Sequence, residues 1–458
     1  MSLVDSLEQL VSWRDGLISP EIYFDEDLYA QEIERVFGHA WIPVGHSDMV
    51  RSPGDYITNY IGEVPIVILR DSTGTVRSFI NRCRHRGNKV CLFDRGQAHS
   101  FTCSYHGWTY GLDGGLVGVP RERDLYADLD RASWGLEEVR VADFNGLLFA
   151  TLDKDASSFE NWLGADARWW LETFVLGVPV GGLEALPGWH RCRVPGNWKL
   201  MAENYIGDNY HVALTHAAWL RTAQELRERG SDIPMATSPL PMRTKEPTYE
   251  VTAGYGSGCP LGLGALRPYS NAMFERDLDE AKRLGPHVVS WLRDRQDRMQ
   301  KALVGTDPPL YGFVNGLLFP NLGLMGYISP MIGRHLLLFH PHGATEHEQW
   351  QWTMVEREAP DVVKELAVQR VYQGQAMAGV IGPDDVENFE RIVEAMRAKR
   401  AQRLPLNFQV HLNDDGDQLP GVRGNISKEP SEVNQRQFYR FWLELMAREP
   451  VAASKGVS

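Results

Sequence analysis

Two short segments that each pair a cysteine with a histidine constrain this chain more than any other feature. Cys83 and His85 are separated by one residue, and Cys103 and His106 by two. Each pair stands at the end of a stretch with the pattern of a β-strand, so two neighbouring loops could each present one thiolate and one imidazole. The spacing therefore predicts a metal centre held by these four side chains.

The order of the four ligands favours an iron-sulfur cluster over zinc. Two cysteines and two histidines also form tetrahedral structural zinc sites. Zinc fingers usually place a cysteine pair before a histidine pair, whereas each loop here carries one of each. In a Rieske [2Fe–2S] centre, two imidazoles replace two thiolates on one iron. We therefore expect a Rieske cluster, with a colourless zinc-stabilised protein as the alternative.

A second group of polar residues lies between residues 197 and 216, in a segment with the apolar spacing of a helix. It contains Asn204, Asp208, His211 and His216. Asp208 and His211 are three residues apart, so they would share a helix face. His211 and His216 are five apart, about 140° around an ideal helix, and can bind one ion only if the helix is distorted or ends between them. We expect a break between them, such as a π-bulge.

A carboxylate is needed to complete an iron site with these two histidines. Two histidines and one carboxylate form the facial triad of non-haem Fe(II) oxygenases, which leaves positions open for dioxygen. The segment 382–388 reads GPDDVEN and offers Asp384 and Asp385. An aspartate at a helix start is usually an N-cap, so Asp384 could cap the helix while Asp385 binds the metal, but the residues alone leave the choice of ligand between the two open.

Together these segments resemble the large (alpha) subunits of Rieske non-haem iron aromatic-ring-hydroxylating dioxygenases. CRHRG and CSYHGW match the cluster loops of that family, and ENYIGDNYHVALTH at 203–216 matches its iron-binding segment. Rieske proteins of respiratory complexes carry an extra cysteine in each loop, where this chain has Asn88 and Tyr105. The resemblance runs from about residue 20 to 445 and implies that Asp385 is the third iron ligand.

The resemblance also implies how two iron centres would cooperate. Electrons from NAD(P)H would reach the cluster through a separate reductase or ferredoxin and then cross to the mononuclear iron of the next subunit in a ring of three. Asp208 would bridge the two centres by accepting hydrogen bonds from His211 of its own chain and His106 of its neighbour. Asn204 would lie beside the iron as a second catalytic residue. A small beta subunit would complete an α₃β₃ assembly, or the ring would stand alone as α₃.

The order of predicted elements indicates an α+β fold. Residues 40–155 contain short strands with glycine-rich turns and predict a small antiparallel β Rieske domain, with hairpins at 64–80 and 108–118. This domain would be inserted between residues 1–39 and 156–458, which together form a larger catalytic domain with an antiparallel sheet flanked by helices. Residues 310–356 predict a meander of strands.

Composition excludes several classes of partner. The net charge of −13 and pI near 5.6 argue against nucleic acid and anionic membranes. The N-terminus does not read as a signal peptide, and no apolar stretch is long enough for a membrane span. Five scattered cysteines indicate a reducing cytoplasm. The absence of a dinucleotide-binding fingerprint is consistent with a separate electron donor.

The reaction implied by the resemblance is insertion of both atoms of O₂ into an aromatic ring, giving a cis-dihydrodiol. An aromatic hydrocarbon is slightly favoured over an aromatic carboxylate, although Gln375 would favour a substituted ring if it reached the substrate. One alternative is a Rieske monooxygenase or demethylase with the same two centres. Another is a non-catalytic Rieske electron carrier, in which residues 156–458 would be a docking module without a third iron.

Overall fold

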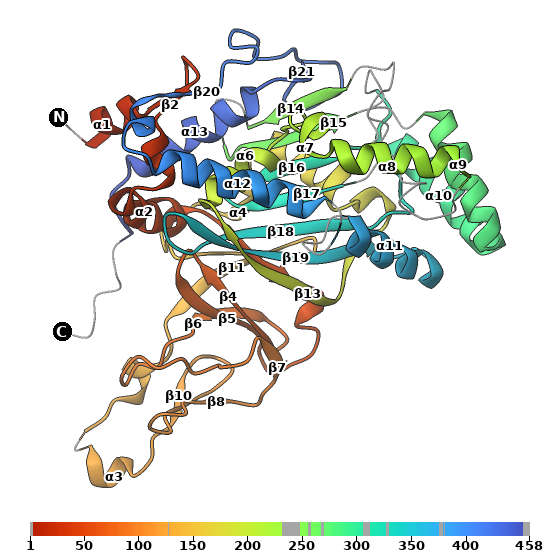
Figure 1. Cartoon of the computed structure of the whole chain (residues 1–458). Coiled ribbons are helices and arrows are strands. Elements are labelled where there is room, and N and C mark those ends of the chain that lie inside the picture. Colours follow the sequence, from red (N-terminus) through yellow and green to blue (C-terminus); the bar gives the residue numbers. More distant parts are fainter. Residues whose placement is uncertain are drawn as a thin grey trace. The chain divides into compact units, whose positions relative to one another are not determined.

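The computed structural model describes residues 3–126, 128–230, 248–254, 258–266, 270–305, 312–326, 329–374, 379 and 381–451 (Figure 1). Contacts divide the chain into two compact units, Ala30–Phe159 with Arg448–Ser458, and Met1–Tyr29 with Glu160–Ala447. The first unit is thus inserted near the start of the second. The first boundary of this inserted unit, at 29/30, lies upstream of the 39/40 division expected from the sequence and falls inside helix α2 (Glu26–Glu32). The second boundary, at 159/160, lies downstream of the expected 155/156 division.

The inserted unit is built from two antiparallel sheets. Seven strands run in the order β3-β12-β11-β6-β5-β4-β7 and three in the order β10-β9-β8. The two predicted hairpins are present as β5–β6 and β9–β10. The strands are β3 (Ile42–His46), β4 (Asp55–Ile61), β5 (Val64–Arg70), β6 (Val76–Ile80), β7 (Arg95–Gln97), β8 (Phe101–Thr102), β9 (Thr109–Tyr110), β10 (Leu116–Gly118), β11 (Glu138–Phe144) and β12 (Leu147–Thr151). The short helix α3 (Glu122–Leu125) follows β10.

One buried cluster in this unit joins strand residues to the two cysteine loops. Phe79, Phe101 and Tyr110 belong to it, as do Cys83 and Cys103, each only 2 % exposed. Because burial of these side chains fixes the loops against the strands, the positions of both cysteines are set by the core rather than by the loops alone.

The larger unit is organised around an eight-stranded antiparallel sheet with the order β13-β19-β18-β17-β16-β15-β14-β21. Strands β16 to β19 form the meander predicted at 310–356. The strands are β13 (Leu183–Pro195), β14 (Tyr249–Ala253), β15 (Leu261–Leu266), β16 (Asn315–Leu318), β17 (Leu322–Met325), β18 (Arg334–Pro341), β19 (Glu346–Glu356) and β21 (Asn425–Lys428). A small separate sheet joins β1 (Val11–Ser12), β2 (Leu17–Ile18) and β20 (Leu406–Asn407).

Helices on this unit bring distant parts of the chain to the sheet. α6 packs against β16, β17 and β18, and α12 packs against β13. α9 and α10 lie between β15 and β16 in the sequence. The remaining bounds are α1 (Leu3–Leu10), α4 (Phe159–Leu163), α5 (Ala165–Trp170), α6 (Trp198–Tyr205), α7 (Val212–Thr215), α8 (Ala217–Glu228), α9 (Asn271–Leu284), α10 (Pro286–Ala302), α11 (Asp361–Gly374), α12 (Gly382–Met396) and α13 (Val433–Met446). Within the described ranges, no helix is long and apolar enough to span a bilayer.

A buried ion pair ties α10 to the end of β19. Arg295 Nε lies 2.9 Å from both carboxylate oxygens of Glu356, and Arg334 NH2 lies 3.4 Å from Oε1. The side chains of Arg295 and Glu356 are 10 % and 6 % exposed. Since a buried charge without its partner is strongly unfavourable, the Glu356 carboxylate stabilises the buried guanidinium groups of Arg295 and Arg334.

We expect Glu356→Gln to lower the free energy of unfolding by about 3 kcal/mol, because two buried guanidinium groups lose their counter-charge. Thermal unfolding followed by circular dichroism measures the effect. Glu358→Gln is the control, because Glu358 pairs with Arg298 at the surface and is 51 % exposed, so its loss should cost less than about 1 kcal/mol. Equal shifts in the two variants would contradict a special role for the buried pair.

Candidate active site and cluster-binding loops

The two cysteine–histidine loops share one backbone design. In each loop the cysteine N–H donates to the carbonyl five residues later, at 2.7 Å for Cys83 and 2.8 Å for Cys103. The glycine four residues later donates back to the cysteine carbonyl, at 3.0 Å for Gly87 and 2.9 Å for Gly107. Both glycines have positive φ, +81° and +76°, which other residues adopt only with strain. Each loop is therefore a closed turn that presents its two ligand side chains together.

The four predicted cluster ligands meet at the tips of these turns. The rings of His85 and His106 lie 4.4 Å apart between centroids and nearly perpendicular. Cys83 Sγ lies 3.3 Å from the Tyr110 hydroxyl. His85 Nδ1 is buried and has no hydrogen-bond partner in the described part of the chain. Two thiol groups and two imidazoles with such an orphaned nitrogen fit the donor set of a Rieske cluster.

The segment expected to bind iron is interrupted twice. Helix α6 ends at Tyr205, and the single-turn helix α7 spans Val212–Thr215, so His211 and His216 flank α7 at its two ends. The expected end of a helix between the two histidines is present at Thr215, as a turn rather than a π-bulge, and an additional turn precedes His211. Gly207, with φ +126°, opens this turn. Asp208 Oδ1 stabilises it by accepting from the N–H groups of Tyr210 and His211.

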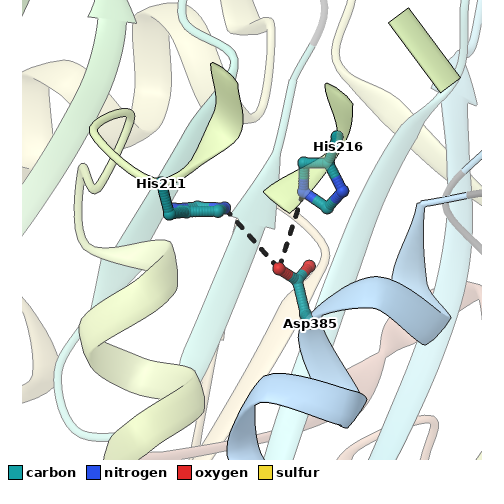
Figure 2. A group of neighbouring side chains, drawn as sticks. All are labelled: His211, His216 and Asp385. Atoms are coloured by element: carbon teal, nitrogen blue, oxygen red, sulfur yellow. Dashed lines mark ion pairs between the residues drawn. The ribbon is translucent and has the colours of Figure 1, made fainter. Parts of the chain in front are cut away.

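Asp385 completes a group of three metal-binding side chains. Its Oδ1 lies 3.6 Å from His211 Nε2 and 3.5 Å from His216 Nε2 (Figure 2). One ligand atom from each of the three residues lies within 4.8 Å of the others. Asp385 Oδ1 is buried and accepts no hydrogen bond from any described residue. A carboxylate oxygen in that position, faced by two imidazole nitrogens, fits a cation bound among the three.

Burial shapes the acid–base properties of this group. Burial raises the pKa of Asp385 even though His211 and His216 oppose the shift. Burial would lower the pKa of His211, but the Asp208 carboxylate outweighs it and raises that pKa. These two pKa shifts arise from burial and from neighbouring protein groups. A bound divalent cation would hold the carboxylate ionised and the imidazoles neutral.

Each histidine has a second carboxylate on the far side of its ring. Asp208 Oδ2 lies 2.9 Å from His211 Nδ1, and Asp384 Oδ2 lies 3.2 Å from His216 Nδ1. Such pairs orient a metal-binding ring and direct its other nitrogen to the metal. The expectation that Asp384 caps α12 is wrong, because Ile381 occupies the N-cap and no side chain caps the helix. Asp384 instead orients His216.

Asn204 joins the site, and several of its supports were not found from the sequence. Asn204 Nδ2 lies 3.4 Å from His211 Nε2. Asn315 Nδ2 donates to the backbone carbonyls of Asn204 and Asp208, both at 3.4 Å, and so ties the turn to β16. Its role depends on β16 lying beneath α6, which no local motif reveals. Gln375, the polar candidate for substrate contact, lies outside the described residues.

Glu203, next to Asn204 in the same predicted segment, has a supporting role that the sequence did not assign. Glu203 Oε1 accepts hydrogen bonds from the hydroxyls of Tyr23, at 2.6 Å, and Tyr439. Burial raises the pKa of Glu203 to about 7, although the two hydroxyls oppose the shift. These contacts hold the C-terminal end of α6 against the start of the chain and α13, which fixes where the turn at Gly207 begins.

Comparison with known proteins agrees with this geometry. Residues 40–134 match the Rieske [2Fe-2S] domain, and residues 184–448 match the catalytic domain of the ring hydroxylating alpha subunits. The chain belongs to this alpha-subunit family. It is an aromatic ring-hydroxylating dioxygenase subunit, with a Rieske cluster, a mononuclear iron and O₂ as co-substrate.

Relatives in this family align over nearly the whole chain. Chlorobenzene dioxygenase subunit alpha from Cupriavidus sp. (strain PS12) is 34% identical over 98% of this chain and 95% of its own length. Biphenyl 2,3-dioxygenase subunit alpha from Rhodococcus jostii (strain RHA1) is 33% identical over 98% and 92%. Among solved structures, naphthalene 1,2-dioxygenase from Rhodococcus sp. bound to indole matches with a TM-score of 0.76, 29% identity, and coverage of 97% and 98%.

We expect Asp385→Asn to lose the mononuclear iron while retaining the cluster, because the amide removes the charged ligand atom. Wild-type protein should contain about three iron and two sulfide per chain, and the variant about two of each. Iron analysis, labile-sulfide analysis and the visible spectrum measure this together. Asp384→Asn, the matched control, should weaken iron binding by about 10–100-fold without abolishing it. Full iron content in Asp385→Asn would contradict the assignment.

Proposed function

We propose that this protein is a terminal oxygenase component that inserts both atoms of O₂ into an aromatic ring to give a cis-dihydrodiol. Its electrons come from NAD(P)H through a separate reductase or ferredoxin. The observation that carries the proposal is the convergence of Asp385 on His211 and His216 in a chain that also carries Rieske ligand loops. A cluster supplies single electrons, and a three-ligand metal site leaves positions open for oxygen.

The roles of the ligands follow from their positions. Cys83, His85, Cys103 and His106 hold the cluster, and His211, His216 and Asp385 hold the iron. When bound, the iron activates O₂ at its open positions. Asp208 and Asp384 keep the two imidazoles turned with Nε2 toward Asp385 Oδ1. Asn204 lies on the Nε2 side of His211, where its side chain also meets Asp385, and it would help to position both groups.

Asp208 is proposed as the bridge between the two centres. Its Oδ2 already contacts His211, yet the side chain is 29 % exposed and can be reached from outside the chain. His106 at the tip of its loop is half-buried rather than enclosed. These two exposures support electron transfer from His106 of a neighbouring subunit to Asp208 and His211, in a ring of three subunits. A small beta subunit would complete the assembly as α₃β₃, and the chain would work in the cytoplasm.

The substrate is proposed to be an arene, with a hydrocarbon framework favoured over a carboxylate. Beside the metal ligands lies an apolar cluster of Trp219, Leu220, Ala223 and Ile381. Trp219 and Ile381 come three residues after His216 and four residues before Asp385, so this cluster lies next to the iron site. Relatives act on arenes, as the names chlorobenzene and biphenyl dioxygenase indicate.

Labelled oxygen tests the reaction directly. The purified protein, supplied with a reductase, a ferredoxin and NADH, would be given naphthalene or biphenyl under ¹⁸O₂. A dioxygenase gives a diol with both oxygen atoms labelled. A product with one labelled atom would replace the proposal with a monooxygenase, and NADH consumption without any organic product would leave only electron transfer.

We expect Asp208→Ala, supplied with enough Fe(II) to fill the site, to keep the visible spectrum of the cluster but to lower turnover on the order of 100-fold, because the link from cluster to iron is removed. Stopped-flow oxidation of the reduced cluster in the presence of substrate and O₂ isolates the transfer step. Asp384→Ala is the control, because it removes the equivalent carboxylate from His216 without touching the proposed route. Unchanged cluster oxidation in Asp208→Ala would rule out the bridge.

A further inference from the structure

One face of the eight-stranded sheet looks toward the iron site. Asn315 on β16 identifies it, because its side chain donates to the carbonyls of Asn204 and Asp208. On the same face Tyr205, the last residue of α6, packs against Phe339 with ring centroids 5.2 Å apart. α12 lies on this face as well, since Asp385 meets His211 there.

The pairing of neighbouring strands shows which residues of β19 lie on this same face of the sheet. Directly paired residues of antiparallel strands point to the same side of a sheet. Asn315 pairs with Met325, Met325 with His335, and His335 with Thr353. In the neighbouring rows Leu337 pairs with Gln351 and Phe339 with Gln349. Gln349, Gln351 and Thr353 therefore lie on the iron-site face.

The two glutamines lie under the helices that carry the iron site. β19 stands between β18, on which α6 packs, and β13, on which α12 packs. Gly196, just after β13, has Leu200 of α6 and Phe389 of α12 as its near neighbours. The inward side chains of β19 thus lie on the face of the sheet that α6 and α12 cover, and Asp385 of α12 faces His211 and His216 (Figure 2).

These buried amides carry hydrogen-bonding capacity that the described chain does not use. Gln349 and Gln351 are only 3 % and 4 % exposed. Gln351 Nε2 contacts His335 Nδ1, but neither Gln351 Oε1 nor Gln349 Oε1 has a partner among the described residues. Leaving such an acceptor buried and unmet costs about 1–3 kcal/mol. A site that binds only unsubstituted hydrocarbons would not recover this free energy, because such a substrate has no donor for the two oxygens.

The charges on this face of the sheet limit which chemical groups could hydrogen-bond to the two amide oxygens. Burial lowers the pKa of His335 to about 3, so its imidazole is neutral at physiological pH. Among the described residues of these rows, none is lysine or arginine. The unpartnered atoms are the two amide oxygens, which accept hydrogen bonds, and a carboxylate has no donor to offer them. The matching group is a neutral donor, such as a hydroxyl or an amine.

We propose that Gln351, with Gln349 beside it, accepts a hydrogen bond from a hydroxyl or amino substituent at the end of the substrate away from the iron. The preferred substrate is then a neutral arene that carries such a donor, ahead of both the bare hydrocarbon and the carboxylate. This inference rests on the proposed arene dioxygenase activity and names the substrate class of that site.

Binding to the oxidised holoenzyme under anaerobic conditions tests the inference without turnover. Isothermal titration calorimetry would compare naphthalene, 2-naphthol and 2-naphthoate, and in a smaller series benzene, phenol and benzoate. In wild-type protein the hydroxylated member should bind about tenfold more tightly than the hydrocarbon, and the carboxylate most weakly. Gln351→Met keeps the side-chain length but removes the amide, so it should abolish the preference for the hydroxylated ring and leave hydrocarbon binding unchanged or tighter.

Matched variants separate this effect from damage to the fold. Gln349→Met tests the second amide independently and should reduce the same preference if Gln351→Met does not fold. Gln437→Met is the control, because Gln437 is a buried glutamine on α13 whose Oε1 accepts from Arg440 Nε, away from the sheet. It should keep the wild-type preference. Cluster spectrum and iron content report whether each variant is intact.

The outcomes distinguish the inference from the function on which it rests. If naphthalene and 2-naphthol bind equally and neither glutamine variant changes their ratio, the inference is overturned while the dioxygenase activity stands. The same holds if the carboxylate binds best. If the reconstituted system oxidises none of these rings, the proposed activity itself fails. A preference for 2-naphthol that both variants lose supports the inference.

Discussion

The position of His211 relative to Asp385 is the constraint on which the site depends, and the eight-stranded sheet sets it from both sides. On one side the turn at Gly207–Tyr210 is tied to β16 through Asn315, and Asn209 also donates to Glu429 Oε1 at 2.8 Å. On the other side α12 packs beside β13. Because both anchors belong to one hydrogen-bonded sheet, residues far apart in sequence are held within metal-binding distance.

Four carboxyl groups near the two histidines have different tasks because their surroundings differ. Asp385 is buried and faces both Nε2 atoms, so it is the group that a cation would hold. Asp208 and Asp384 are more exposed and contact the Nδ1 atoms, which leaves them to orient the rings. Glu203 is enclosed with two tyrosine hydroxyls and fixes the end of α6. Burial and direction, rather than residue type, separate metal binding from support.

Local spacing was enough to predict the cluster loops, the two hairpins and the strand meander, because each depends on residues close in sequence. The histidine pair and the helix end between its members were also predicted locally, but the turn before His211 was not, since it is set by Gly207 and by contacts with β16. Asp384 was misassigned because an aspartate at a helix start resembles a cap until the helix is seen beside His216. That Gln349 and Gln351 of β19 are buried depends on α6 and α12, which lie over their face of the sheet and whose packing no local pattern contains.

The repeated turn design of the two cysteine loops has a consequence for how the four ligands are spaced. Each loop is closed by its own pair of backbone hydrogen bonds and by a glycine that already has the required conformation. Each loop therefore fixes the spacing of its own cysteine and histidine through its backbone, while the strands that carry the two loops set the distance between the pairs.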